Sequence, residues 1–166
     1  MQRIPPLFPA LFACVVAALA TTESLGFDSA SVQRLIKTNA CQSCELSKAN
    51  LNELDLQKAD LRVAVLSWAT LTGANLHRSN LSGTVLHGVD LRNADLSGAN
   101  LIGAYLQEAN MEGASLRGAN LSGAILNKAN LTGADLTGAV LNHASLDGAV
   151  FCRTKRSSAR EDNTGC

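Results

Sequence analysis

Cysteine is the residue type in this 166-residue sequence that is best suited to do chemistry, because five cysteines occur and four of them follow the N-terminal segment. Cys41 and Cys44 form a Cys-x-x-Cys motif, which occurs in thiol–disulfide enzymes and as half of many zinc sites. Thiol–disulfide enzymes carry this motif near a βαβ pattern, which the sequence lacks. We therefore favour structural disulfides made by Cys41, Cys44, Cys152 and Cys166. The alternatives for the Cys41-x-x-Cys44 motif are a redox-active pair or part of a metal site.

The N-terminal segment predicts the compartment in which those cysteines lie. Arg3 precedes a mostly apolar stretch over residues 7–19, and Ala18-Leu19-Ala20 fits the small-x-small rule for signal cleavage. The stretch is too short for a comfortable membrane span, which needs about 20 apolar residues. We interpret residues 1–20 as a cleaved export signal, so we expect an oxidising compartment and no stable membrane insertion of the mature chain. The alternative is a lipoprotein that is lipidated at Cys14.

Charge and composition exclude several classes of protein. Fourteen Lys and Arg balance fourteen Asp and Glu, so the basic surface of a nucleic-acid-binding protein is absent. Removal of residues 1–20 leaves 13 basic against 14 acidic residues, so a strongly acidic surface is not expected either. The chain is 46% hydrophobic, which excludes a disordered chain, but only 4% aromatic, which is too little for an ordinary mixed core.

A period of five residues organises the chain from Leu46 to Phe151. All 22 positions at this spacing hold a large apolar residue, and 20 of them are Leu. Two residues before each lies a second regular position, which is Ala in 17 of the 22 cases. None of these 44 residues is charged, so both positions are expected to face one core.

Neither an α-helix nor a β-strand sends every leucine of such a period to one side. A step of five residues turns a helix by about 140°, and in a strand it points successive leucines to opposite faces. The chain must therefore turn a corner once per repeat, which defines a solenoid of very short straight segments. Eleven of the 13 glycines lie two residues after the central Leu, where a type II turn needs a positive φ. Asp or Asn often precedes that Leu, which suits a tight outward-facing bend.

The outward-facing residues indicate four sides per coil. The position just before the central Leu is apolar in six of the 22 repeats, and four of these residues are spaced 20 apart. A coil of four repeats therefore stacks them into one ladder, which consists of Val65, Val85, Tyr105 and Ile125. Apolar side chains on adjacent coils favour a protein contact or a dimer face. The alternative is lateral stacking along a β-ladder without a partner.

The same register disperses the other candidates for chemistry. Two histidines fall on opposite faces and one on a corner, so we expect neither a metal site nor a catalytic site from His77, His87 and His143. Three aspartates share one face and alternate there with neutral residues, in the order Asp55, Asn75, Asp95, Ser115 and Asp135. This alternation favours a solvated face over an acidic ribbon. The two cysteine pairs lie at opposite ends of the rod, which argues against a shared zinc site.

The sequence of residues 119–138, Ala-Asn-Leu-Ser-Gly-Ala-Ile-Leu-Asn-Lys-Ala-Asn-Leu-Thr-Gly-Ala-Asp-Leu-Thr-Gly, resembles the pentapeptide-repeat family, whose motif is Ala-(Asp/Asn)-Leu-x-x. The resemblance covers residues 44–153. It implies an all-β fold, a right-handed quadrilateral β-helix, with the central Leu and Ala pointing inward. The Cys41-Gln42-Ser43-Cys44 entry and the Thr164-Gly165-Cys166 exit look like those of exported members, which are known from cyanobacterial and plastid lumenal spaces. We accordingly expect the periplasm or the thylakoid lumen.

Some repeats depart from the family motif. Leu54, Ser79, Thr84 and Val89 occupy positions where Ala is usual. Two large residues occupy corner positions that elsewhere hold Gly, namely Val63 and Trp68. These two departures predict a distorted coil around residues 61–70.

Both ends of the rod are expected to be capped, because an open β-solenoid exposes unpaired strand edges. Asp28 is placed to be the N-cap of a short helix over residues 29–38, with Phe27 and Val32 as a hydrophobic staple and Val32, Leu35 and Ile36 as the apolar face. A Cys152–Cys166 bridge would close the other end and stabilise it by about 3 kcal/mol. Cys41–Cys44 would be the second bridge. The chain thus divides into a signal peptide (1–20), an N-terminal cap (21–43), the repeats (44–153) and a capping tail (154–166).

These inferences favour an exported, non-catalytic scaffold that binds another protein, without a cofactor, and with a homodimer as a further expectation. One alternative is a DNA mimic like the family members that protect gyrase from quinolones. Those members are cytoplasmic and strongly acidic, whereas residues 44–153 hold ten acidic and eight basic residues. The other alternative is a thiol–disulfide enzyme that uses Cys41 and Cys44.

Overall fold

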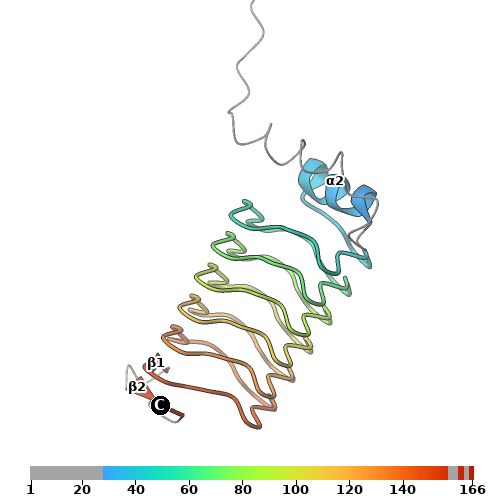
Figure 1. Ribbon diagram of the computed structural model, residues 1–166. Helices are drawn as coiled ribbons and strands as arrows, with labels where there is room; N and C mark the ends of the chain where they lie inside the picture. The colour runs from blue at the N-terminus through green and yellow to red at the C-terminus, as the bar shows by residue number, and fades with distance from the viewer. Residues whose placement is uncertain (1–27, 157–160, 163–164) are drawn as a thin grey trace, which may run out of the picture.

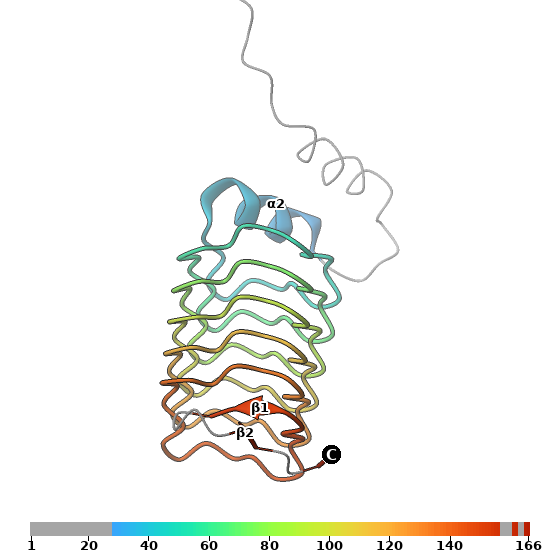
Figure 2. The same cartoon turned by 90° about the vertical axis from the view of Figure 1, so that its left-hand side faces the viewer.

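The backbone of the computed structural model winds into a rod of stacked coils (Figures 1 and 2). The structure describes residues 28–156, 161–162 and 165–166, so the proposed signal peptide (1–20), Cys14 and Phe27 lie outside the described residues. Helix α2 (Ser29–Thr38) lies at one end of the rod, and strands β1 (Thr154–Lys155) and β2 (Glu161–Asp162) lie at the other. No helix within the described ranges is both long enough and apolar enough to cross a membrane.

Each coil has four sides and twenty residues. Parallel β-bridges join neighbouring coils, and every bridge joins a residue to the one twenty positions later, from Ala40–Asp60 to Asp135–Lys155. Two backbone hydrogen bonds flank each contact: the Leu66 N–H donates to the Val85 carbonyl (2.7 Å), and the Val85 N–H donates to the Ala64 carbonyl (2.9 Å). This constant step confirms the predicted quadrilateral β-helix and its register.

A column of leucines fills the centre of the rod. The 19 central positions from Leu46 to Leu136 are at most 2% exposed, and most of the alanines two residues before them are equally buried. Burial of one such leucine stabilises by about 1.5–3 kcal/mol, so this column carries most of the stability of the fold. Leu141 and Leu146 are only half-buried, because they belong to the last coil that the described residues form and no later coil pairs with it there.

The corners follow from two local features of each repeat. The N–H of the inward alanine closes the turn on the leucine carbonyl three residues earlier, as between Ala64 and Leu61 (3.1 Å). The second central residue of the turn is left-handed, with φ of 62–72° at the 11 corner glycines. All twelve Asp and Asn residues just before a central position, which is Leu in eleven cases and Met111 in one, accept a hydrogen bond from the N–H two residues on, as Asn100 does from Ile102 (3.2 Å).

The distortion expected around residues 61–70 is absent. Val63 and Trp68 take the same left-handed conformation as glycine, with φ of 58° and 61°. Bridges through this coil keep the step of twenty. The prediction was wrong because the side chain at this corner points to solvent, with Val63 60% and Trp68 52% exposed. The left-handed backbone conformation of a large residue here destabilises the fold by roughly 1–2 kcal/mol, but the side chain does not displace the neighbouring coil.

The N-terminal helix matches its predicted bounds and N-cap. Asp28 accepts hydrogen bonds from the Ala30 N–H (3.0 Å) and the Ser31 N–H (3.2 Å), which satisfies donors that a helix start leaves unpaired. Val32 and Leu35 are buried in the core cluster, so α2 covers part of the first coil. Figure 1 shows α2 lying across this end of the rod.

The C-terminal end closes differently. Thr154 takes the inward alanine position and donates to the Leu131 carbonyl (2.7 Å), so the ladder continues to Lys155 in β1. Strand β1 pairs antiparallel with β2. The Arg156 guanidinium lies over the Phe151 ring, 4.3 Å from its centroid. These contacts cover part of the last coil without repeating the pentad.

Candidate functional site

The four sides of the rod differ in chemistry, and we number them by their ladders of bridged residues. Side 1 consists of Glu45, Val65, Val85, Tyr105, Ile125 and Ser145. Side 2 consists of Asn50, Thr70, Asp90, Asn110, Asn130 and Val150. Side 3 consists of Asp55, Asn75, Asp95, Ser115, Asp135 and Lys155. Side 4 consists of Ala40, Asp60, Asn80, Asn100, Asn120 and Val140. Only side 1 is apolar along its middle coils.

Three further apolar residues extend side 1 onto its two corners. Val63 and Ile102 lie at the corner before side 1, and Trp68 lies at the corner after it. Of the five exposed large hydrophobic residues in the described part of the chain, four belong to side 1 or these corners, and the fifth, Val140, ends side 4. We call the combined surface the apolar face, defined by Val63, Val65, Trp68, Val85, Ile102, Tyr105 and Ile125.

The corner residues of the apolar face were not identified from the sequence, although a signal was present. Val63 and Trp68 are the only apolar residues at the second turn position of any repeat, and Ile102 is the only large aliphatic at the first. Counting these positions in steps of twenty places all three beside the predicted ladder.

Trp68 is held flat against the rod by a glycine on the next coil. A Cβ atom at Gly88 would overlap the Trp68 ring, so the indole lies directly on the backbone there. The His87 ring meets the indole edge-on, with the ring centroids 5.0 Å apart. About half of the Trp68 side chain is exposed, which gives the apolar face a fixed aromatic edge.

Charge is confined to the edges of the apolar face. Arg62 is paired with Asp60 of side 4 at 2.8 Å. Lys128 lies 3.9 Å from Glu108 at the corner after side 1, and the Lys128 side chain is 75% exposed. Such exposed pairs contribute little to stability.

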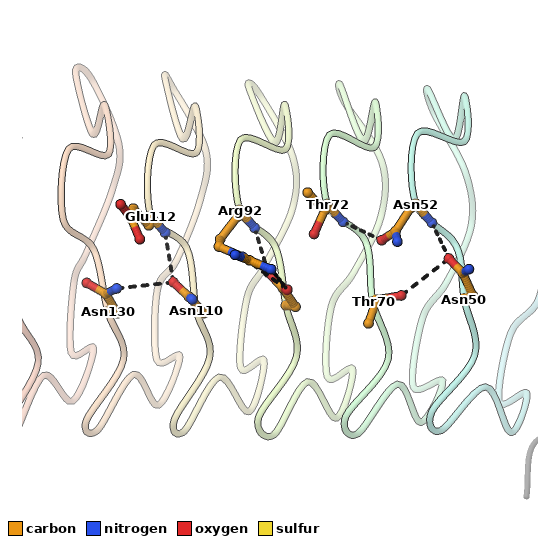
Figure 3. A network of polar contacts seen from close by, with 9 residues as sticks. Asn50, Asn52, Thr70, Thr72, Arg92, Asn110, Glu112 and Asn130 are labelled. Atoms are coloured by element: carbon orange, nitrogen blue, oxygen red, sulfur yellow. Dashed lines mark hydrogen bonds and ion pairs between the residues drawn. The ribbon is translucent and has the colours of Figure 1, made fainter. Parts of the chain in front are cut away.

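The polar side chains of side 2 hydrogen-bond to one another and to neighbouring residues of the rod (Figure 3). The Thr70 hydroxyl donates to Asn50 Oδ1 (3.3 Å) and the Asn130 amide donates to Asn110 Oδ1 (3.1 Å). Between them, Arg92 pairs with Asp90 at 2.6 Å. Hydrogen bonds along the ladder leave no group of side chains converging on a common point.

Sides 3 and 4 carry aspartates that are held ionised. The Arg62 hydrogen bond lowers the pKa of Asp60 to about 2 against the opposing effect of burial. For Asp135, burial is the largest single influence and raises the pKa, but hydrogen bonds from Thr137 and Arg117 together lower it to about 2. The Arg117 guanidinium is 2.8 Å from Asp135. The alternation of charged and neutral residues along side 3 fits the solvated face that the sequence predicts, and the structure adds hydrogen bonds such as that from the Asn75 amide to Asp55 Oδ1 (2.9 Å).

The structure joins Cys41 to Cys44, with their Cα atoms 5.3 Å apart. Cys41 occupies a central leucine position and Cys44 an inward alanine position of the same turn, so both side chains point into the core and are 0% and 6% exposed. Helix α2 covers them, with Arg34 Nη1 3.9 Å from Cys44 Sγ. Thiol–disulfide exchange needs access to a sulfur, so this burial disfavours a redox role.

A metal site finds no support in the described ranges. The second disulfide, Cys152–Cys166, lies at the other end of the rod, and no group of three metal-ligand side chains occurs in the described residues. His77 and His87 occupy opposite corners, and His77 Nδ1 is 2.7 Å from the Ser97 hydroxyl. His143 is at a third corner, so the three imidazoles do not converge.

This architecture defines the class of protein: a right-handed quadrilateral β-helix with leucine on its axis. Matches to the model for pentapeptide repeats, with eight copies, span residues 44–83, 59–98, 94–133 and 114–151. The chain belongs to the pentapeptide repeat family. Comparison with curated proteins finds no significant match.

Solved structures of the same family are similar to this chain. Rfr23 from the cyanobacterium Cyanothece 51142 is 33% identical over 78% of this chain and 96% of its own, with a TM-score of 0.56. HetL from Nostoc sp. strain PCC 7120, described as involved in heterocyst differentiation regulation, is 30% identical over 74% of this chain and 64% of its own, with a TM-score of 0.51. A protein from the Arabidopsis thaliana thylakoid lumen is 32% identical over 51% of this chain and 63% of its own, with a TM-score of 0.39.

Proposed function

We propose that this chain is an exported, non-catalytic scaffold whose apolar face binds another protein. One observation carries the proposal: four of the five exposed large hydrophobics in the described part gather on one side and its corners, while the other three sides are polar along their middle coils. A contiguous exposed apolar patch with a polar surround is typical of an interaction site. The export signal over residues 1–20 and the four remaining cysteines support a periplasmic or thylakoid-lumenal location.

The experiment compares three forms of the mature chain, which begins at residue 21, as bait in an extract of the exported compartment. A charge at the centre of the apolar face, in Tyr105→Glu, is expected to abolish capture of the partner because a buried unpaired carboxylate is costly. Asn100→Glu on side 4 is the matched control, since Glu45 shows that a glutamate at a ladder position still accepts the turn hydrogen bond, from the Ser47 N–H (3.0 Å). Equal capture by all three forms would contradict the proposal.

Export is tested separately. Residues 1–27 are fused to a reporter enzyme that becomes active only outside the cytoplasm, with a fusion lacking residues 1–20 as the control. Reporter activity is expected only from the fusion that contains residues 1–20. If both fusions are inactive, the export part of the proposal is wrong.

A further inference from the structure

We infer that the apolar face receives an amphipathic α-helix of the partner, laid along the rod axis. This inference rests on the proposed function and adds to it the chemistry of the bound segment. Three properties of the face carry it: its saturated backbone, its dimensions and its distribution of charge.

Along the ladder of side 1, the backbone peptide groups are already hydrogen-bonded between neighbouring coils. The Tyr105 N–H donates to the Thr84 carbonyl (3.0 Å), and the Tyr105 carbonyl accepts from the Leu86 N–H (2.8 Å). The Ile125 N–H and carbonyl are bonded in the same way to Ala104 (2.9 Å) and Leu106 (2.7 Å). An extended segment laid on this face would bury its own peptide groups without partners, at a cost of about 1–3 kcal/mol for each. A helix satisfies its peptide groups internally, so it can bury a side-chain surface against the face at no such cost.

The dimensions fit one helix and are too small for a second copy of the chain. Six coils at about 4.8 Å make the ladder of side 1 about 24 Å long, and one side of the coil is about 10 Å wide. A helix is about 10–12 Å across and covers 24 Å with about 16 residues. A strip of about 24 by 10 Å gives about 480 Å² in total for two copies packed through it, whereas stable interfaces bury about 1,200–2,000 Å². A helix on the same strip also buries a small area, so its contact belongs to the weak, transient class.

The shape of the face also suits a helix. Tyr105 and Ile102 project from it, whereas Gly103 and Gly123 carry no side chain at the corner before side 1, and a Cβ atom at either glycine would meet nothing within 4 Å. A rounded partner can therefore reach the ladder between the projecting side chains.

Charge specifies the partner helix further. The ladder from Val65 to Ile125 is uncharged, so the contacting stripe of the helix is apolar, with large residues at positions i, i+3, i+4 and i+7. Lys48 and Lys128 lie at the corner after side 1, near the two ends of the ladder. Glu108 is 3.9 Å from Lys128, and Glu45 lies on side 1 in the same coil as Lys48, so both lysines have an acidic residue near them and the flank of the helix needs no fixed charge.

The test is a selection from a random 16-residue peptide library displayed on phage, with the mature chain as the target and Tyr105→Glu for counter-selection. Enriched peptides are expected to carry the i, i+3, i+4, i+7 apolar pattern. Synthesised versions should gain helical circular dichroism on binding and change the fluorescence of Trp68, the only tryptophan. Tyr105→Glu should weaken binding at least tenfold, and Asn100→Glu should leave it unchanged. Trp68→Gly is a second variant, because glycine fits the left-handed φ of 61° and removes the ring without strain.

Three outcomes would overturn the helix: enriched peptides with an alternating or proline-containing pattern, peptides that bind without gaining helicity, or no enrichment. A dimer in sedimentation equilibrium that Tyr105→Glu dissociates would assign the face to a second copy instead. If the captured natural partner is lost with Tyr105→Glu but the bound peptides are not helical, the proposed function stands and this inference fails. If capture is insensitive to Tyr105→Glu, the proposed function itself fails.

Discussion

Polar residues at inward positions are tolerated in this rod when a carbonyl of an earlier coil accepts their hydroxyl. Thr84 Oγ1 donates to the Leu61 carbonyl (2.9 Å), and Thr154 Oγ1 donates to the Leu131 carbonyl (2.7 Å), which is the same contact 70 residues later. Ser79 is also 1% exposed, but its hydroxyl has no partner. A buried hydroxyl without a partner costs about 1–3 kcal/mol. The unpaired hydroxyl of Ser79 therefore destabilises the folded state.

Replacing Ser79 with the usual alanine is expected to raise the free energy of unfolding by about 1 kcal/mol, because it removes the unpaired hydroxyl. Thr84→Ala at the next inward position should instead lower it by about 1 kcal/mol, since a made hydrogen bond and a methyl group are lost. Urea unfolding followed by circular dichroism measures both changes. Opposite signs at these two adjacent inward sites are the expected result, and a destabilised Ser79→Ala protein would contradict the argument.

The ionised aspartates predict how the protein responds to acid. The folded-state pKa of Asp60 and Asp135 is about 2, below the ordinary value of 3.8. A group whose pKa is lowered by folding stabilises the fold above its unfolded pKa, and this contribution is lost as the pH falls through the folded pKa. The urea midpoint should therefore be constant above about pH 5 and fall between about pH 4 and pH 2. Asp135→Asn should make that fall shallower, and an unchanged pH profile would show that this ion pair contributes nothing.

At the scale of the element, the unit of this fold is the left-handed corner. Glycine adopts the corner conformation without strain, yet many corners carry other residues, with φ of 53–61° at positions such as Lys48, Val63 and Arg78. The tolerance arises because the corner side chain leaves the rod, so the cost is confined to one φ angle. Gly88 is different, since its missing Cβ makes room for the Trp68 ring. The same residue type therefore serves backbone conformation at most corners and side-chain packing at this one.

Gly88→Ala is expected to be more destabilising than Gly103→Ala. Both alanines would carry left-handed strain of about 1–2 kcal/mol, but only the first also displaces the indole. In the double variant Trp68→Gly/Gly88→Ala, the cost of the alanine should fall to that measured at Gly103, because the ring is gone. Equal costs for the two single variants in urea unfolding would show that the Trp68–Gly88 contact is absent in solution.

At the scale of the whole molecule, the rod is a one-dimensional stack in which each coil contacts its neighbours. Stability is then approximately a sum over coils and their contacts, and the ends are its weakest points. Cys41 and Cys44 replace a Leu and an Ala of the first turn, which puts a covalent bond where no earlier coil lies. At the other end, Leu141 and Leu146 remain half-buried, so the last coil gains less from its leucines than the middle coils do.

Alanine at a central leucine should cost less at the end of the rod than in its middle. Leu101→Ala removes a fully buried side chain from a middle coil and is expected to cost about 2–5 kcal/mol. Leu146→Ala removes a half-exposed one and should cost about 1 kcal/mol. Urea unfolding measures the pair, and equal costs would mean that segments beyond the described residues bury the last coil completely.

The architecture of the rod was predictable from the order of the residues. A leucine every fifth residue can face one axis only if the chain turns at each repeat, and the spacing of Val65, Val85, Tyr105 and Ile125 fixed four repeats per coil. The helix over residues 29–38 followed from Asp28 and the apolar spacing behind it, and the structure has the same bounds. These features were predictable because each depends on local geometry or on strict periodicity.

The tertiary structure alone decided what depends on contacts between coils. It showed that Val63 and Trp68 fit an undistorted corner, because their side chains point outward, and that Trp68 lies on Gly88. It left the Ser79 hydroxyl unpaired while pairing that of Thr84, which the repeat pattern treats alike. It also joined both corners of side 1 to the ladder in one apolar face. Periodicity gives the direction of each side chain, but the surface that side chains form together depends on how residues twenty positions apart pack against one another.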